Sequence, residues 1–241
     1  MIAAGRCTTP VLRHSSVLLL WCWSAAVFAA SIAIDVGHYA AKPGAFSARG
    51  RPEFGFNLDL ARAIEAALKA RGHATRLIGD DGAMKDLWRR PREADGFDLF
   101  VSVHHDSVQE RYLSNWIHDG VERRYSDLFS GFSLFVSPVN PEWKRSLRCA
   151  SAIGAALRRA GFEPSLYHAD PVLGENRPFA DKDNGVHYFD NLAVLRHARL
   201  PALLFEAGVI VNREEETRMR DKKVQQQIAA SVADGIDACL K

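Results

Sequence analysis

The chain contains little cysteine or methionine and has almost no charge imbalance. Its 241 residues include four cysteines and three methionines, and 31 basic side chains face 29 acidic ones, a formal net charge of +2. Such a balance gives no electrostatic footprint for nucleic acid, so we expect no nucleic-acid partner. Internal repeats and low-complexity tails are also absent from the sequence. What is left is the pattern of an ordinary globular domain.

Acidic residues are missing altogether from the first thirty positions, which we predict to be an export signal. Arg6 and Arg13 charge its start, "VLLLWCWSAAVFAA" forms an apolar stretch over 17–30, and Val27 and Ala29 suit the positions before a cleavage point. A membrane anchor is the alternative, but the stretch is shorter than the roughly 20 residues of a typical spanning helix. We therefore expect an exported protein, periplasmic or extracellular, that is free of the membrane once the signal is removed.

Removal of the signal leaves residues 31–241 as one predicted domain. Without Arg6 and Arg13 its basic residues number 29, equal to its 29 acidic residues. The two remaining cysteines, Cys149 and Cys239, would lie in an oxidising compartment, where a disulfide persists. The sequence leaves open whether they pair or stay as two buried thiols.

Strand and helix patterns alternate along this domain. "SIAIDVGH", "HATRLI", "FDLFVSV" and "GFSLFVSP" are predicted strands, "LPALLFEAGVIVN" is a predicted strand with its exit, and residues 56–68, 143–160 and 224–240 show helical spacing, with Gly72 and Gly161 placed to end the first two helices. A charged, helical stretch is expected between the second and third strands. The alternation predicts a single α/β domain of three layers, with a mostly parallel twisted sheet flanked by helices on both faces. The stretch from Glu163 to about His187 is expected to be an irregular, functional loop.

Polar residues follow three of these strands where each strand ends. Asp35 and His38 come after "IAI" in the first run, His104 to Asp106 after "LFVSV" in the third, and Glu206 after "ALLF" in the last. Because ligand sites of open α/β sheets lie outside the carboxyl ends of the strands, we expect these groups to converge. Glu53, at the start of the first long helix, is a fourth candidate.

Histidine and carboxylate side chains in such a group suit hydrolytic zinc chemistry. Two imidazoles and one carboxylate hold zinc and leave a fourth position open to water, and a second carboxylate can then serve as general base. Glu206 is the candidate for this base.

Four segments together resemble the zinc-dependent N-acetylmuramoyl-L-alanine amidases, which cut the stem peptide from the glycan of peptidoglycan. "IDVGH", "GRPEFGFNLDLA", "DLFVSVHHD" and "LPALLFEAGVIVN" resemble that family's motifs in the family's order. The resemblance implies His38, Glu53 and His104 as Zn²⁺ ligands and Glu206 as the catalytic glutamate. It departs from the family at Val36, His105 and Phe205, and in the long connection "VQERYLSNWIHDGVERRYSDLFS", where the family has a shorter one.

Strand geometry, like the resemblance, predicts different roles for the two adjacent histidines. Successive residues of a strand point to opposite faces of the sheet, so His104 and His105 are not expected to share one ion. His104 is the predicted ligand. For His105 the sequence leaves open a contact with a helix, with substrate or with a neighbouring side chain.

The expected activity is hydrolysis of the amide between the lactyl group of N-acetylmuramic acid and L-alanine, in peptidoglycan or in muropeptides. The alternatives are a zinc peptidase acting on short cell-wall peptides and an inactive wall-binding or regulatory module of the same fold. The interval before the last strand contains one helix that the core needs, so we predict no blocking helix and no dedicated activator.

Overall fold

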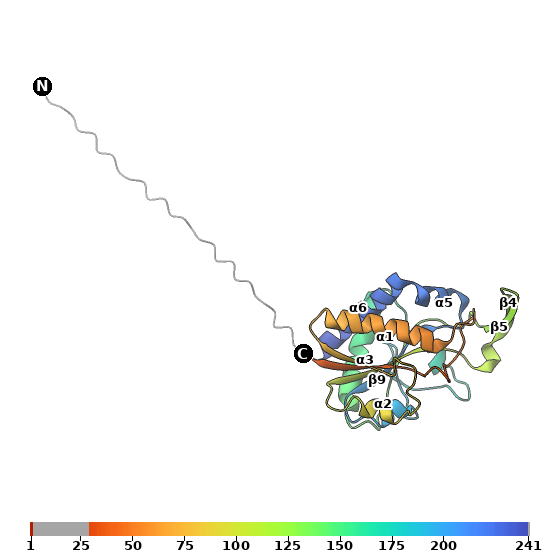
Figure 1. Ribbon diagram of the computed structural model, residues 1–241, viewed down its shortest axis with the longest axis horizontal. Coiled ribbons are helices and arrows are strands. Elements are labelled where there is room, and N and C mark those ends of the chain that lie inside the picture. The colour runs from red at the N-terminus through yellow and green to blue at the C-terminus, as the bar shows by residue number, and fades with distance from the viewer. Residues whose placement is uncertain (2–28, 241) are drawn as a thin grey trace.

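A computed structural model describes Met1 and residues 29–240 of the chain (Figure 1). The predicted export signal lies outside the described residues except for its two ends. No helix in the described part of the chain has the length and apolar character needed to cross a membrane.

A seven-stranded sheet forms the centre of the domain, as the alternation predicts. Its strands run in the order β2-β1-β3-β9-β6-β8-β7, and neighbours are parallel except at the β6/β9 and β7/β8 pairs. The mostly parallel α/β class is therefore confirmed. The strands are β1 (Ser31–Val36), β2 (Ala74–Ile78), β3 (Leu99–Asp106), β6 (Ser133–Val136), β7 (Phe179–Asp181), β8 (Val186–Tyr188) and β9 (Ala202–Val209).

Three long helices cover one face of this sheet. They are α1 (Glu53–Lys69), α3 (Trp143–Arg159) and α6 (Lys222–Cys239), and a shorter α5 (Arg213–Arg220) precedes α6. Buried side chains at every third or fourth position of these helices meet alternate residues of the strands in the larger hydrophobic core. Figure 1 shows α1 and α6 on the same side of the sheet.

The opposite face is covered more thinly than predicted. Its helices, α2 (Arg89–Arg92) and α4 (Ala193–Arg196), have four residues each, and a smaller core lies beneath them. The expected helix before the third strand is thus only α2. Asp81 and Asp86 explain the shortfall, because each accepts a hydrogen bond from a backbone amide two residues further on and so favours turns over helix.

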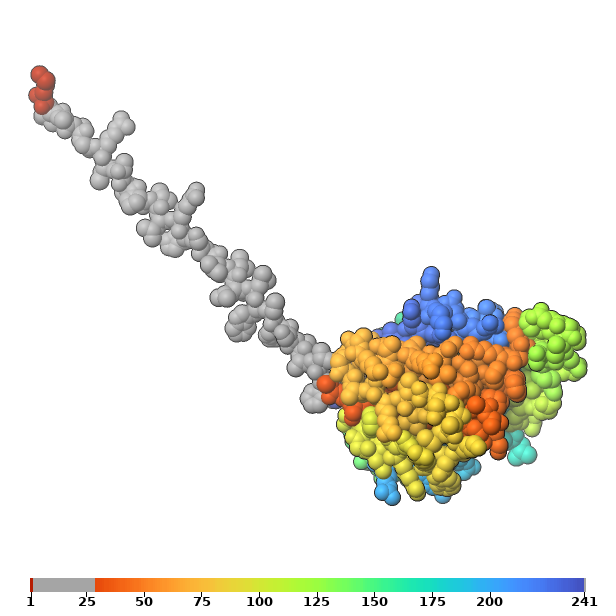
Figure 2. Space-filling view, viewed as in Figure 1, coloured from red at the N-terminus to blue at the C-terminus, as the bar shows by residue number. Residues whose placement is uncertain are grey.

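The long connection after β3 contains a hairpin that the sequence did not reveal. After the 3₁₀ turn η1 (Glu110–Tyr112), strands β4 (Ser114–His118) and β5 (Val121–Tyr125) pair with each other and not with the main sheet. Trp116 anchors the hairpin by donating from its indole Nε1 to the Ala48 carbonyl over 2.9 Å. Figure 2 shows this segment, in green, at the edge of the body.

The expected irregular loop is more ordered than predicted. It contains the 3₁₀ turn η2 (Tyr167–Ala169) and the two three-residue strands β7 and β8, and β8 extends the main sheet by pairing with β6. Strands of three residues among Pro, Gly, Asp and Asn leave too short a pattern for sequence reasoning to detect.

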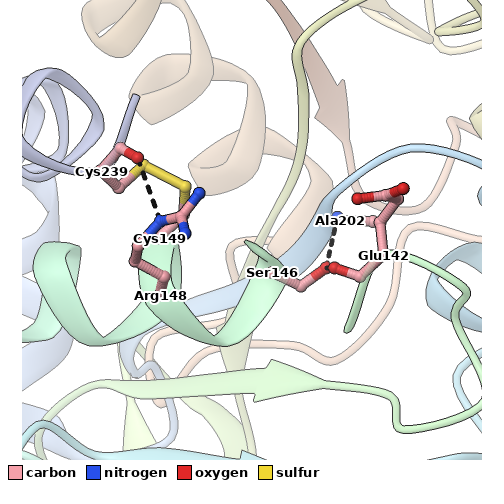
Figure 3. Close-up of a disulfide and its surroundings, with 6 residues drawn as sticks. All are labelled: Glu142, Ser146, Arg148, Cys149, Ala202 and Cys239. Atoms are coloured by element: carbon pink, nitrogen blue, oxygen red, sulfur yellow. Dashed lines mark hydrogen bonds between the residues drawn. A yellow bond between two sulfur atoms is a disulfide. The ribbon is translucent and has the colours of Figure 1, made fainter. Parts of the chain in front are cut away.

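The cysteine question is decided in favour of a disulfide. Cys149 on α3 and Cys239 on α6 are bonded, with their Cα atoms 5.0 Å apart (Figure 3). The same region of α3 is tied to β9, because the Ala202 amide donates to Ser146 Oγ over 2.9 Å. The last helix is therefore fixed covalently to the layer that supports β9.

Candidate metal centre

His38 projects from the turn that follows β1, in a backbone conformation that needs support. Its φ is +68°, in the left-handed region that side chains rarely adopt. The buried guanidinium of Arg90 provides support by donating to the His38 carbonyl and, over 2.6 Å, to the Val36 carbonyl. Arg90 is paired with Asp35, again at 2.6 Å, and Asp35 accepts from Ser102 Oγ. A buried ion pair thus holds the first histidine in position.

Glu53 is the first residue of α1, and its carboxylate lies between two histidines. Its Oε2 is 2.9 Å from His38 Nε2 and its Oε1 is 3.1 Å from His104 Nδ1. Burial alone would raise the pKa of Glu53, but hydrogen bonds and charge from His104 and His38 outweigh burial and hold this pKa well below its usual range. Glu53 is therefore an anion poised between two imidazoles.

The three predicted ligand residues come together in the structure. One nitrogen of His38, one nitrogen of His104 and one carboxylate oxygen of Glu53 all lie within 4.8 Å of one another. Lone pairs that converge in this way suit a metal ion, and two imidazoles with one carboxylate are a common set for hydrolytic zinc. The residues present therefore fit a metal ion, and their identity as zinc ligands stays a prediction.

Two glycines leave the space that this convergence needs. A Cβ at Gly37 would lie 2.4 Å from the His104 ring, and a Cβ at Gly44 would lie 2.2 Å from Glu53 Oε2. Any side chain at either position would push a predicted ligand aside. The loop after β1 is thus shaped around the cluster.

Gly44→Ala should weaken metal binding more than its strain alone would explain. The new methyl group meets the Glu53 carboxylate, and the φ of +79° adds about 1–3 kcal/mol of strain. We expect roughly a tenfold loss of zinc affinity, as for other disturbances next to ligands. Gly72→Ala is the matched control, because Gly72 has a φ of +85° and no atom within 4 Å of the added Cβ. Equal zinc affinity in both variants would contradict this account.

Glu206 lies next to His104 on the neighbouring strand. The two residues are direct partners in the β3/β9 register, and Ser133 of β6 lies on the other side of Glu206. Burial, with the negative charges of Asp106 and Glu53, raises the pKa of Glu206 well above its usual value. Its buried Oε2 has no hydrogen-bond partner among the described residues. An unpaired buried carboxylate is costly, so this position suits a group that handles protons.

His105 is outside the cluster, on the opposite face of β3. Its ring lies 5.5 Å from that of Phe56 on α1 and is almost completely buried. Burial lowers the pKa of His105 to about 3. The expectation that the two adjacent histidines face different ways is met, since the His104 ring lies 4.9 Å from that of His38.

Sequence reasoning missed a second charged group beside the cluster. His168 lies between Asp106, at 2.6 Å, and Glu175, at 2.9 Å. Burial lowers the pKa of His168, but the two carboxylates outweigh burial and raise it to about 9. This group ties the segment after α3 to the end of β3. His168 and His187 are both buried.

A cavity opens directly beside the histidines. Its volume is about 340 Å³, and its wall includes both clustered histidines and Leu204. The rest of its lining comes mainly from the turn after β1, the segment before α2, and residues 192–194 around the start of α4. The thinly covered face of the sheet therefore gives a small molecule access to the cluster.

Comparison with known proteins identifies the family. The family model for N-acetylmuramoyl-L-alanine amidase matches residues 32–238, nearly the whole described domain. The chain belongs to this amidase family. The match extends from β1 to the end of α6, so it includes all four predicted site residues.

Individual amidases are also similar to the chain, in sequence or in fold. A probable N-acetylmuramoyl-L-alanine amidase, AmiB, of Haemophilus influenzae is 26% identical over 90% of this chain, which covers 54% of that protein. The chain thus spans about half the length of this curated relative. Among solved structures, the catalytic domain of CwlV from Bacillus (Paenibacillus) polymyxa var. colistinus has a TM-score of 0.66 and 25% identity, covering 88% of this chain and 98% of that one. Ami1 from Mycobacterium smegmatis, at 21% identity and a TM-score of 0.69, covers 88% and 96% and shows the same fold.

Proposed function

We propose that the chain hydrolyses the amide between the lactyl group of N-acetylmuramic acid and L-alanine in peptidoglycan, at a zinc ion held by His38, Glu53 and His104. The observation that supports this most directly is the His–Glu–His cluster at the carboxyl ends of the strands, with an unpaired carboxylate next to it. Zinc, when bound, supplies a Lewis acid that activates water and polarises the amide carbonyl.

Glu206 is the proposed general base and acid. Its carboxylate accepts a proton from the attacking water and then delivers that proton to the leaving amine of L-alanine. The register that places Glu206 beside His104 puts the carboxylate next to a predicted ligand. Burial and the nearby negative charges raise the pKa of Glu206, and a more basic carboxylate is a better acceptor for the proton of the water.

The cavity beside the cluster is the proposed substrate site. It has an apolar wall from Leu87, Leu192 and Val194, and two exposed lysines, Lys42 and Lys85, lie among its lining residues. A stem peptide carries carboxylates as well as apolar side chains, so this lining suits the peptide better than a neutral glycan.

Digestion of a purified muropeptide by residues 31–241 tests the proposal. Mass spectrometry should find an intact stem peptide that begins with a free L-alanine amine, together with a glycan that ends in a free lactyl carboxyl group. Shortened stem peptides that remain attached to the glycan would show a zinc peptidase instead. Muropeptide that stays uncut by a folded, zinc-loaded chain would favour an inactive wall-binding or regulatory module.

Export and regulation remain part of the proposal. Residues 1–30 would direct the chain out of the cytoplasm to the compartment that contains peptidoglycan. Residues 31–241 would then act in a periplasm or outside the cell. We propose that the enzyme works without a dedicated activator. In support, the long helix between β3 and β9 is α3, which packs in the core against α6.

A further inference from the structure

The buried side chain of His105 makes a polar contact with a residue of α1. Its Nδ1 lies 2.9 Å from Oδ1 of Asn57, which is four residues after Glu53 on α1. The Asn57 Nδ2 in turn lies 3.0 Å from Glu53 Oε1 and 3.2 Å from the Gly37 carbonyl oxygen. Three side chains are thereby connected from the core face of the sheet to the metal cluster.

The chemistry of these groups fixes the direction of each hydrogen bond. A carboxylate and a carbonyl oxygen can only accept, so the Asn57 amide must direct its Nδ2 toward both of them. Its Oδ1 then faces His105 and needs a donor. The His105 proton is therefore on Nδ1, and a reversed amide would place oxygen against oxygen at two contacts.

Glu53 is held at both oxygens by this arrangement. Oε1 accepts from Asn57 Nδ2 and from the His105 backbone amide, the latter at 3.3 Å, and Oε2 accepts from the Ala45 amide at 3.2 Å. The carboxylate cannot rotate about its own axis without breaking several of these bonds. Its orientation toward the two clustered histidines is thus set by groups outside the cluster.

We propose that His105 is a positioning residue, which acts through Asn57 to hold the Glu53 carboxylate in its metal-binding orientation. The inference rests on the proposed metal site and concerns how that site is prepared. His105 is not one of the three clustered residues, and its ring packs near Phe56 of α1. His105 fixes the orientation of the Asn57 amide, and the amide fixes the orientation of the Glu53 carboxylate. The carboxylate therefore already has its metal-binding orientation before the metal binds.

Zinc affinity, measured by competition with a chromophoric chelator, tests this relay without relying on activity. His105→Leu fills the space but lacks the donor, and we expect zinc to bind roughly tenfold more weakly, within the usual range for residues that support a ligand. His105→Asn places an amide N–H near the position of Nδ1 and should restore affinity to within about threefold of wild type. In the cobalt-substituted protein, the visible absorption bands should shift in His105→Leu and return in His105→Asn.

Two further variants separate the relay from general packing. In a His105→Leu and Asn57→Ala double variant, affinity should be no weaker than in Asn57→Ala alone, because both changes remove one pathway. His73→Leu is the matched control, since His73 is also buried and hydrogen-bonded but contacts Ala30 and Asp237, away from the cluster. It should lower stability and leave zinc affinity unchanged.

The outcomes distinguish this inference from the proposed function. A folded His105→Leu variant with wild-type zinc affinity and an unshifted cobalt spectrum would overturn the relay. If His105→Leu fails to fold, His105→Gln replaces it, because Gln keeps a polar side chain but moves the donor one bond further out; equal affinity in the Gln and Asn variants would then overturn the relay. Wild-type chain that binds zinc but leaves muropeptide uncut would refute the proposed substrate and keep the relay, whereas wild type that binds no zinc would remove both.

Discussion

Glu206→Gln should lose nearly all hydrolysis while it still binds zinc. The amide of glutamine has the size of the carboxylate but cannot accept the proton of the attacking water. General acid–base catalysis by one positioned group contributes roughly 10² to 10⁴ in rate, so we expect kcat to fall by about 10³. Zinc affinity should change little, because Glu206 is not part of the three-residue cluster. Steady-state hydrolysis of muropeptide and a zinc titration of the same sample measure both quantities.

Glu215→Gln is the control for this experiment. Glu215 is also a buried carboxylate near β9, but it accepts from the backbone amides of Val209 and Gly131, each at 2.9 Å. This variant should lose some stability and keep its turnover, because the role of Glu215 is structural. If Glu206→Gln hydrolyses muropeptide at the wild-type rate, the role assigned to Glu206 is wrong.

Among the variants proposed here, removal of the disulfide should cause the largest loss in the free energy of unfolding. Cys149 and Cys239 are 90 residues apart in the chain, and a bond that closes a loop of this length stabilises the folded state by about 4–5 kcal/mol in the chain-entropy model. In a domain of this size, such a loss lowers the melting temperature by roughly 10–20 °C. Calorimetry of a Cys149→Ala and Cys239→Ala double variant measures the shift.

Reduction provides an independent check on the same bond. A thiol reductant should lower the melting temperature of the wild type toward that of the double variant and should leave the variant unchanged. Zinc has to be supplied equally to every sample, because thiol reductants also bind metal ions. A double variant that melts within about 2 °C of the wild type would show that the bond contributes little, since 2 °C corresponds to only about 1 kcal/mol in a domain of this size.

The parts of the fold that the sequence predicted are those with long patterns. The helical spacing over residues 56–68 and the continuous apolar strands extend over several turns or residues, so local pattern and burial agree. The β4/β5 hairpin and the strands β7 and β8 are short and rich in polar residues, and their pairing depends on contacts with distant parts of the chain. Sequence pattern alone cannot supply such contacts.

In the site, too, the sequence predicted some residues and missed others. His38, Glu53, His104 and Glu206 were identified from strand ends and from motif order, and the structure brings the first three together with the fourth alongside. Arg90 was missed, because nothing in "WRRPRE" distinguishes a buried arginine from its exposed neighbours. Asn57 carried a usable sign, since it follows Glu53 by four residues and such residues share one face of a helix.

The central claim is that His38, Glu53 and His104 hold a zinc ion on which amidase activity depends. The most direct test measures bound metal and newly exposed L-alanine amino ends in one sample of residues 31–241 acting on purified peptidoglycan. We predict one zinc per chain, and L-alanine ends that disappear with a chelator and return when zinc is added back. A chain that releases these ends at the same rate after complete removal of the metal would contradict the account.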